Sequence, residues 1–384
     1  MKKKGAVLIG FMPNPRIYKR IALEKEILDI SLICWDKGSN MLPPPKEDGY
    51  TAHIIKIGAG GNPLKRLGPY ARFCKKAGRL LRDIRPDLIH VQGLDMLKIA
   101  VAYKKAAGLD VAIIYEVADL HQLIVDPPKS PVRWAAQCYL IHEDRRCAKE
   151  ADLLIVTSPQ YIDKYFHAFV PAEKTMYIPN VPNLEAFRGY QKKVRGEPLV
   201  VGYIGGIRYK RQMRNLLTAA KRCGVKLMIA GFENEPVEIE PLCKGNPDIE
   251  WVGRFDFNSQ VSALYGKCDL MYSVYDADME NVRVALPNKL YESVYCEMPI
   301  IVAKGTYLAE IVSQWGVGVA VDHRNPEDLT KELEKLVNFP DYYDKFVKNC
   351  SDHKDEVDLA RYNAALKSWI VNRLLLDGNG EALR

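Results

Sequence analysis

The chain has 384 residues, of which 48% are hydrophobic and 27% charged, with a formal net charge of +7. This composition excludes an intrinsically disordered chain, and no apolar run approaches the roughly 20 residues that a membrane-spanning helix needs. The length exceeds the size at which a single hydrophobic core usually stops growing, so two domains are expected.

The chain begins with a basic segment, Met1–Gly5, and continues with an apolar run, Ala6–Met12, that ends at Pro13 and Pro15. Because this run is short and no small-residue cleavage pattern follows it, we expect a first β-strand of a cytoplasmic protein rather than a signal peptide. The nine cysteines are widely spaced without a CxxC pair, and the histidines do not fall at metal-ligand spacing. The sequence therefore predicts neither a disulfide framework nor a metal site.

Short runs rich in β-branched residues alternate with helical patterns along the whole chain, which predicts parallel sheets built from βαβ units. In the first half these runs are residues 5–12, 30–35, 53–58, 86–93, 111–117, 152–158 and 175–180. In the second half they are residues 199–205, 225–231, 249–253, 268–275, 298–305 and 318–322. The polar stretch 184–198 between the two sets is the candidate linker. A final helical pattern, Leu359–Leu376, can cap either domain.

The positive charge is concentrated in the first half, where residues 1–190 carry 29 Lys and Arg against 20 Asp and Glu. Its densest part, Leu64–Arg85, predicts an amphipathic helix with a cationic outer face. The expected inner stripe consists of Leu64, Leu67, Ala71, Cys74, Leu81 and Ile84. The cationic face is either simply solvated or contacts an anionic membrane. Nucleic acid is disfavoured because no aromatic-interleaved basic motif accompanies the charge.

A candidate anion site follows the apolar run Leu199–Ile204, which leads directly into Gly205-Gly206 and then into a helix. Backbone amides at such a glycine turn can approach phosphate oxygens closely. Arg208, Lys210 and Arg211 can add charge-assisted contacts to a diphosphate. The alternative is a tight turn followed by solvated cations.

The sharpest local signal is the segment Ala285–Glu292. Pro287 is suited to the first helical position, so we expect the helix to begin there, with its free amides and positive dipole end facing an anion. Glu292 lies five residues further, about 7.5 Å along the axis, which would let its carboxylate accept ribose hydroxyls while the phosphates stay at the helix end. The alternative is a surface pair of Lys289 and Glu292.

This segment resembles the donor-site signature of the retaining nucleotide-sugar glycosyltransferases of GT-B fold, the family that includes sucrose, glycogen and mannosyl transferases. The order of the other parts is similar: a glycine turn at Gly205-Gly206, a VxLxIxG strand at Val225–Gly231, a base-side loop at Ile249–Phe255, and the carboxylate helix with its following strand at Pro287–Ala303. The first half resembles the family 4-like subgroup of capsule and cell-wall enzymes more loosely, at Pro15-Arg16, Cys34–Asp36 and Tyr115–Leu120.

The resemblance implies an α/β protein with two Rossmann-like domains whose parallel sheets face each other across a cleft. Residues 1–190 would bind the acceptor and residues 198–352 the nucleotide sugar, with a C-terminal helix at about 353–384 returning to the first domain. The predicted donor-binding residues are Gly205, Gly206, Arg208, Lys210, Arg254, Phe255, Leu286, Pro287, Asn288, Lys289 and Glu292. One departure is Val284, which stands eight positions before Glu292 where the family commonly has a first glutamate. Glu280, Asn281 or backbone groups are the candidates that hold the donor sugar instead.

In the first domain, Asp119 and His121 follow the predicted strand 111–117, and ligands collect at the carboxyl ends of such strands. We predict that His121 orients an acceptor hydroxyl or the transferred sugar and that Asp119 holds it; the alternative is a structural or exposed histidine. Arg208, Lys210 or Lys289 would neutralise the departing diphosphate. Asp276-Ala277-Asp278 has the form of a metal-binding DxD triplet, which is common by chance, so we predict metal-independent transfer.

The predicted function is transfer of a sugar from a UDP- or GDP-linked donor to a glycan or lipid-linked acceptor, with retention of configuration, in surface polysaccharide or glycoconjugate synthesis. No cofactor and no nucleic acid are expected, and the protein would be cytoplasmic with a peripheral membrane contact through Leu64–Arg85. Two alternatives stay open: a sugar-nucleotide epimerase of the same fold, and a non-catalytic GT-B partner subunit, which the residue Val284 would suit.

Overall fold

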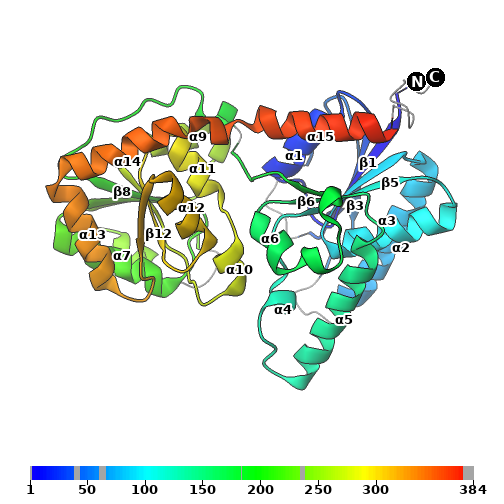
Figure 1. The fold of residues 1–384 in the computed structure, drawn as a ribbon, viewed down its shortest axis with the longest axis horizontal. Helices are drawn as coiled ribbons and strands as arrows, with labels where there is room; N and C mark the ends of the chain where they lie inside the picture. The colour runs from blue at the N-terminus through cyan, green and yellow to red at the C-terminus, as the bar shows by residue number, and fades with distance from the viewer. Residues whose placement is uncertain (1, 39–43, 60–65, 183, 234–237, 375–384) are drawn as a thin grey trace. The chain divides into compact units, whose positions relative to one another are not determined.

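The computed structural model describes residues 2–38, 44–59, 66–182, 184–233 and 238–374 (Figure 1). The chain divides into two compact units, one formed by Met1–Pro179 together with the segment from Leu359 onward and the other by Asn180–Asp358. Each unit is an open, entirely parallel sheet with helices between most successive strands. This is the α/β fold class that the alternating pattern predicts, and each predicted strand run overlaps an observed strand.

The first unit has a seven-stranded sheet in the order β3-β2-β1-β4-β5-β6-β7. Its strands are β1 Lys4–Ile9, β2 Asp29–Asp36, β3 Thr51–Lys56, β4 Leu88–Gln92, β5 Ala112–Val117, β6 Leu153–Val156 and β7 Thr175–Tyr177. Its helices are α1 Pro15–Glu24, α2 Leu67–Ile84, α3 Leu94–Ala107, α4 Gln122–Val125, α5 Pro131–Ala148, α6 Pro159–Lys164 and α15 Leu359–Leu374. The central strands are buried on both faces, as runs of apolar residues in a parallel sheet require.

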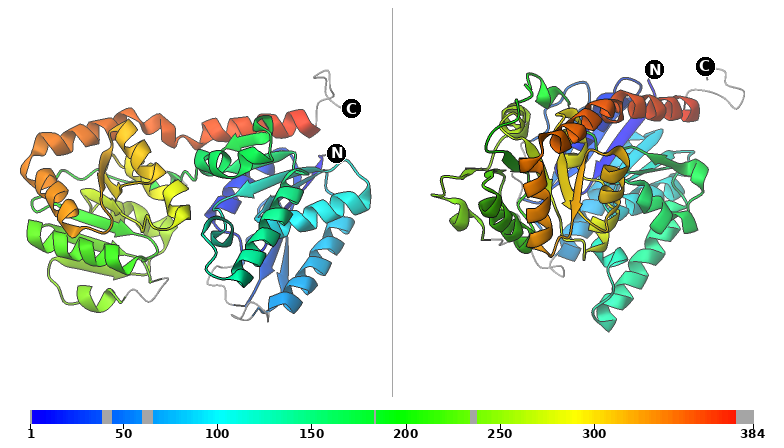
Figure 2. Two further views of the ribbon diagram at one scale, coloured as in Figure 1. Left: turned by 60° about the horizontal axis from the view of Figure 1, so that its bottom comes forward. Right: turned by 60° about the vertical axis from the view of Figure 1, so that its left-hand side comes forward.

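Helix α15 belongs with the first unit although it follows the whole second unit in sequence. Its apolar residues Leu366 and Ile370 are fully buried in the core that α1 and the β1 face of the sheet also form. Ion pairs also hold this helix: Lys367 with Glu26, and Arg373 with both Asp110 and Asp152. Figure 2 shows the helix from two further sides. The described part of the expected C-terminal helix therefore runs from Leu359 rather than from about 353.

The inner stripe predicted for the basic helix is correct at Leu81 and wrong at Leu67 and Ala71, whereas Cys74 and Ile84 are half-buried. In α2 the buried residues are Phe73, Ala77 and Leu81, whereas Leu67 is 64% exposed. The spacing of four residues places Phe73 inward, where its ring stacks on Trp35 at a centroid distance of 4.7 Å. The predicted cationic face is present, because Arg72, Lys75, Lys76, Arg79 and Arg82 are exposed. Leu64 and Lys65 lie outside the described residues.

The second unit has a six-stranded sheet in the order β10-β9-β8-β11-β12-β13. Its strands are β8 Val200–Ile204, β9 Lys226–Ala230, β10 Ile249–Gly253, β11 Leu270–Ser273, β12 Ile300–Ala303 and β13 Gly318–Val321. Its helices are α7 Lys210–Cys223, α8 Glu240–Cys243, α9 Phe257–Tyr265, α10 Glu280–Val284, α11 Asn288–Tyr295, α12 Tyr307–Trp315, α13 Pro326–Asn338 and α14 Pro340–Asp352. Among the helices of the described residues, none is long and apolar enough to cross a bilayer.

The boundary between the units lies at Pro179 and Asn180, ahead of the expected linker at 184–198. Although that stretch is polar in composition, it contains Phe187, which is fully buried and ends a short 3-10 helix at Leu184–Phe187. Its ring packs edge-on against Tyr265 and Tyr295, at centroid distances of 5.3 and 5.6 Å. Residues 180–190 therefore belong to the second unit rather than to a domain ending at 190.

We predict that Ile370→Ala in α15 lowers the free energy of unfolding of the first unit by about 2–5 kcal/mol, the usual cost of emptying a fully buried aliphatic site. The measurement is denaturant unfolding followed by Trp fluorescence. Ser368→Ala, on the exposed side of the same helix, should stay within about 0.5 kcal/mol of the unmodified chain. Equal effects of the two substitutions would contradict the docking of α15 into this core.

Candidate active site

The second unit has a topological switch point between β8 and β11, because β8 pairs with β9 on one side and with β11 on the other. Open α/β sheets bind ligands outside the carboxyl ends of the strands at such a point. Here β8 ends in Gly205-Gly206, and α11 follows the neighbouring β11. The predicted glycine turn and the predicted carboxylate helix therefore come from adjacent strands.

The glycine turn depends on the backbone conformations of two glycines. Gly205 and Gly231 have φ angles of +138° and +152°, which other residues rarely adopt. A Cβ atom on Gly231 would lie 1.8 Å from the carbonyl oxygen of Gly205, and the Gly205 amide donates to the Ala230 carbonyl at 2.8 Å. Gly231 thus shapes the turn after β8. The sequence did not predict this role, because Gly231 simply ends the strand pattern 225–231.

Lys289 reaches from the first turn of α11 to this turn. A Cβ atom on Gly205 would lie 3.6 Å from Lys289 Cε and 4.0 Å from its Nζ. The same ammonium pairs with Glu292 and lies 3.3 Å from the Tyr265 hydroxyl. A positive charge is therefore held beside backbone that no side chain covers, which is a favourable place for a phosphate group.

Glu292 lies one turn along α11, and its side chain is only 1% exposed. Among the described residues, its contacts with Tyr265 and Lys289 both end on Oε2. Burial together with the Glu292 carboxylate raises the pKa of Tyr265 well above its usual value, so this hydroxyl donates to Glu292. The carboxylate is thus fixed in orientation, with Oε1 left for another donor.

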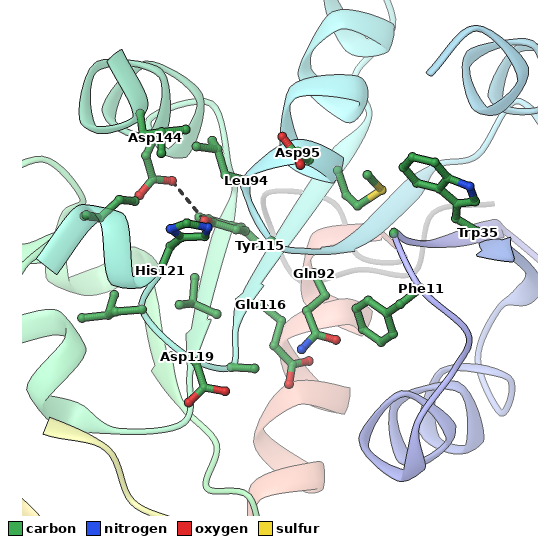
Figure 3. Close-up of a pocket in the computed structure, with 18 of the residues that line it drawn as sticks. Phe11, Trp35, Gln92, Leu94, Asp95, Tyr115, Glu116, Asp119, His121 and Asp144 are labelled. Atoms are coloured by element: carbon green, nitrogen blue, oxygen red, sulfur yellow. Dashed lines mark hydrogen bonds between the residues drawn. The ribbon is translucent and has the colours of Figure 1, made fainter. Parts of the chain in front are cut away.

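The first unit contains a pocket of about 470 Å³ at the carboxyl ends of β1, β4 and β5. Asp119 and His121, both predicted on the acceptor side, line it together with Glu116 and Gln92 (Figure 3). His121 also accepts a hydrogen bond from the Leu123 amide at 3.2 Å, which caps α4. The aromatic residues that line the pocket are Phe11, Trp35, Tyr115 and Phe166.

The family described as glycosyl transferases group 1 matches residues 190–353, and the glycosyl transferase 4-like domain matches residues 22–181. Succinoglycan biosynthesis protein ExoL of Rhizobium meliloti (strain 1021) is 24% identical over 324 residues, which cover 80% of this chain and 78% of ExoL. The chain belongs to the family 4-like glycosyltransferases of GT-B fold.

Solved structures agree with this glycosyltransferase fold. Sucrose-phosphate synthase of Thermosynechococcus elongatus is 16% identical with a TM-score of 0.71, over 96% of this chain and 98% of that chain. HepE of Anabaena, solved in complex with UDP, is 15% identical with a TM-score of 0.69, over 96% and 100% of the two chains. A UDP-N-acetylglucosamine 2-epimerase, 13% identical with a TM-score of 0.60 over 97% and 96%, shares the fold, so the fold alone does not separate transfer from epimerisation.

The carboxylate helix of this glycosyltransferase begins at Asn288, one residue later than expected. Pro287 has an extended backbone conformation, with ψ at 156°, and is the N-cap of α11 rather than its first helical residue. The side-chain oxygen of Asn288 accepts a hydrogen bond from the Asn180 side chain. Leu286 is buried just before the cap. The amides of the first turn still lie at the end of α11 that faces the switch point.

The other predicted donor residues of the glycosyltransferase are less closely grouped. Arg208 is exposed directly after the glycine turn, and Lys210 pairs with Glu238 at the start of α7. Arg254 follows β10, and its guanidinium lies over the Phe232 ring at 4.4 Å from the centroid. Phe255 is half-buried beside it. Of the predicted cations, Lys289 is the one that the structure brings against the glycine turn.

Val284, at the position of the family's first glutamate, ends α10 and is buried. Glu280 stands one turn earlier on the same helix and pairs with Arg283 at 2.8 Å. The Arg283 side chain also donates to the carbonyl of Ala277 at 2.7 Å. The carboxylate of Glu280 therefore lies close to Val284, but it is already paired with Arg283.

The DxD-like triplet lies beside a histidine. Asp276, Asp278 and His323 offer ligand atoms within 4.8 Å of one another. However, the Asp278 carboxylate is paired with Arg324, and the imidazole Nδ1 of His323 lies 3.1 Å from the Gln212 side chain. A cation bound here would have to displace the arginine, so this arrangement is better suited to holding the loop than to holding a metal.

A buried ionic network lies beneath the pocket of the first unit. Arg20 Nε donates to Glu116 Oε2 at 2.9 Å, and His90 contacts Glu116 at 3.1 Å and Glu24 at 2.5 Å. Burial alone would lower the pKa of His90, but Glu24 and Glu116 raise it to about 9. Burial would raise the pKa of Glu116, but Arg20 and His90 hold it well below its usual value. Sequence analysis missed this network, although charged residues within apolar strands signal it.

We predict that this network makes the stability of the first unit depend on pH. Because the pKa of His90 rises from 6.5 to about 9 on folding, its contribution is fully present below about pH 6.5 and is lost as the pH rises through about 9. His90→Gln should flatten this decline in the free energy of unfolding, and the difference should be at most about 3 kcal/mol. The measurement is urea unfolding from pH 6 to 9.5. Parallel curves for His90→Gln and the parent would contradict it, and exposed His167→Gln is the control.

Proposed function

We propose that this chain transfers a sugar from a nucleoside-diphosphate donor to a glycan or lipid-linked acceptor. The observation that carries the proposal is the convergence of Lys289, Gly205 and Glu292 at the switch point of the second unit. A diphosphate there would meet bare backbone, an ammonium group and the amino end of α11, three features that each favour an anion. Glu292 would accept ribose hydroxyls through Oε1.

Departure of the nucleoside diphosphate is the step at which charge develops, and Lys289 and Arg208 are the groups that would neutralise it. Fixed cations and helix amides would then replace a metal ion, which makes the proposed reaction metal-independent. Asp119 and His121 would position the acceptor in the pocket of the first unit. Retention of configuration follows from the family resemblance alone.

The base of the donor nucleotide and the product of the pathway are proposed only as classes. Arg254, stacked on Phe232 at the carboxyl ends of β10 and β9, is the candidate platform for the base, which would be that of UDP or GDP. The UDP complex of HepE and the name of ExoL support a UDP-linked donor and a role in polysaccharide synthesis. With Val284 in place of a carboxylate, Glu280, Asn281 or backbone groups would hold the donor sugar.

Two alternatives are separated by a simple assay. An epimerase would convert a nucleotide sugar incubated alone into its epimer, whereas a glycosyltransferase would release sugar only slowly without an acceptor. A non-catalytic partner subunit, which buried Val284 would suit, would bind nucleotide weakly or not at all.

The cationic face of α2 supports a proposed peripheral contact with anionic lipid at the cytoplasmic face of a membrane. Lys75, Lys76, Arg79 and Arg82 are exposed along this helix. A second surface of the same unit has the composition of an interfacial segment, because Val132 and Trp134 at the start of α5 are 79% and 58% exposed beside the cation Arg133. Exposed Trp with neighbouring cations is typical of segments that lie at the lipid headgroups.

The donor site is tested with Glu292→Gln, which keeps the shape of the side chain and one acceptor oxygen but removes the charge. A hydrogen bond to a charged group contributes about 1.5 to 3 kcal/mol, so we expect kcat/KM to fall roughly 10- to 100-fold and the thermal shift by nucleoside diphosphate to shrink. Glu310→Gln, which makes the same change on an exposed glutamate of α12, is the matched control and should leave nucleotide binding unchanged.

These measurements are made in EDTA. Nucleotide binding as tight in Glu292→Gln as in the parent would refute the donor-site assignment. A strict requirement for Mg²⁺ or Mn²⁺ would instead direct attention to Asp276 and Asp278.

Membrane contact is tested by replacing Lys75, Lys76, Arg79 and Arg82 together with Gln. Each cation near anionic lipid contributes about 1 kcal/mol, so binding to phosphatidylserine-containing liposomes should weaken by at least about tenfold, with nucleotide binding unchanged. The control replaces four exposed lysines of the second unit with Gln: Lys221, Lys331, Lys345 and Lys348. Equal losses of liposome binding in the two variants would indicate only a general effect of charge. Unchanged liposome binding in the α2 variant would indicate that its cationic face is simply solvated.

A further inference from the structure

The polar side chains that line the pocket of the first unit are mostly hydrogen-bond acceptors. Its lining includes the carboxylates of Asp95, Asp119 and Asp144. It also includes Gln92, whose Oε1 is buried without a hydrogen-bond partner among the described residues. Burying an acceptor such as this amide oxygen without a hydrogen-bond donor lowers the stability of the fold. Its position beside a pocket therefore points to a ligand that supplies the missing donor.

Gln92 is fixed in place by the sheet. It is the last residue of β4 and pairs in register with Glu116 of β5. In Figure 3 its side chain lies beside those of Glu116 and Phe11. Both oxygens of the neighbouring Glu116 carboxylate already have partners in Arg20 and His90, whereas the amide oxygen of Gln92 has none among the described residues.

The charges around the pocket disfavour an anionic ligand. Lys37 is its one lysine, and this ammonium lies over the Trp35 ring at 4.8 Å from the centroid. Asp144 lies at the opposite side of the pocket, where it accepts from the Tyr115 hydroxyl at 3.0 Å (Figure 3). A phosphate or carboxylate brings acceptors and negative charge only, so it would meet these carboxylates without donors to satisfy.

The apolar part of the lining fits the carbon face of a sugar ring. Trp35 is stacked on Phe73 at 4.7 Å and 11°, and the Lys37 ammonium lies over the same indole, so Trp35 forms part of the pocket wall rather than a free surface. Phe11 lies between Trp35 and Gln92 in Figure 3 and is partly exposed. The ring of Phe11 beside a row of acceptors complements a molecule that has C–H groups on one face and hydroxyl groups at its edge.

We propose that this pocket takes the uncharged, hydroxyl-bearing sugar at the end of the acceptor and that Gln92 selects it by accepting a hydrogen bond from one hydroxyl group. This proposal rests on the proposed function and narrows its acceptor to a neutral glycan terminus. In a lipid-linked acceptor the carrier phosphate then lies outside the pocket. Uronic acids and sugar phosphates are rejected there.

The first test uses Gln92→Leu, which removes the amide with little change in volume. Because the lost oxygen is unsatisfied in the free protein, the melting temperature should stay the same or rise, while binding of neutral methyl glycosides, measured by saturation-transfer NMR, should weaken about tenfold. Gln160→Leu on α6, which does not line the pocket, should leave binding unchanged. A merely structural Gln92 predicts the reverse, a lower melting temperature with glycoside binding intact, and that result overturns the proposal.

The second test compares ligand charge. Methyl glucoside, methyl galactoside and methyl mannoside are set against methyl glucuronide and glucose 1-phosphate. Neutral glycosides should bind at least about tenfold more tightly than the anions, and Asp119→Asn should weaken the neutral ligands while improving the anions. Preferential binding of an anion, or no binding of any neutral glycoside, overturns the proposal. Nucleoside-diphosphate binding is measured in parallel, because its loss would refute the donor site and not the acceptor inference.

Discussion

The proposed donor side depends on the position of Lys289 beside the glycine turn after β8. Gly231 lets this turn fold back onto the end of β9, since a Cβ atom there would lie 1.8 Å from the Gly205 carbonyl oxygen. The Lys289 ammonium is held in this position, because it contacts Glu292 and Tyr265 on its buried side. A charge fixed before the ligand arrives loses little freedom on binding, which is the physical basis of preorganised electrostatic stabilisation.

The first unit uses buried charge differently. Arg20, Glu24, His90 and Glu116 form a compact set of two carboxylates, a guanidinium and an imidazole, and the pKa of His90, at about 9, means that the set is electrically balanced near neutral pH. A balanced network avoids an uncompensated buried charge, which would be strongly destabilising. It also saturates Glu116 and so fixes the floor of the pocket, leaving Gln92 as the neighbouring group that a ligand can engage.

The fold was largely predictable because apolar runs of strand length repeat at regular intervals, and the β8 turn and the α11 segment were predictable because they are local in sequence. The inner stripe of α2 was not, since Phe73 is directed inward by stacking on Trp35 from a distant strand. The unit boundary was missed for a similar reason, because one buried ring, Phe187, outweighs a polar stretch. The pocket was half predicted: Asp119 and His121 follow a strand, whereas Gln92 and Trp35 join them only through the order of the sheet.

The replacement of a carboxylate by Val284 fits a site whose remaining parts are unusually constrained. Val284 is buried at the end of α10, and Arg283 ties that helix both to Glu280 and to the Ala277 carbonyl. A loop held in this way can present backbone groups at fixed positions, and backbone donors and acceptors bind sugar hydroxyls without adding charge. Most polar side chains in the pocket of the first unit are also hydrogen-bond acceptors, so both proposed sites would suit hydroxyl groups. In the proposed function, a diphosphate beside Lys289 and the glycine turn would then distinguish the donor from the acceptor.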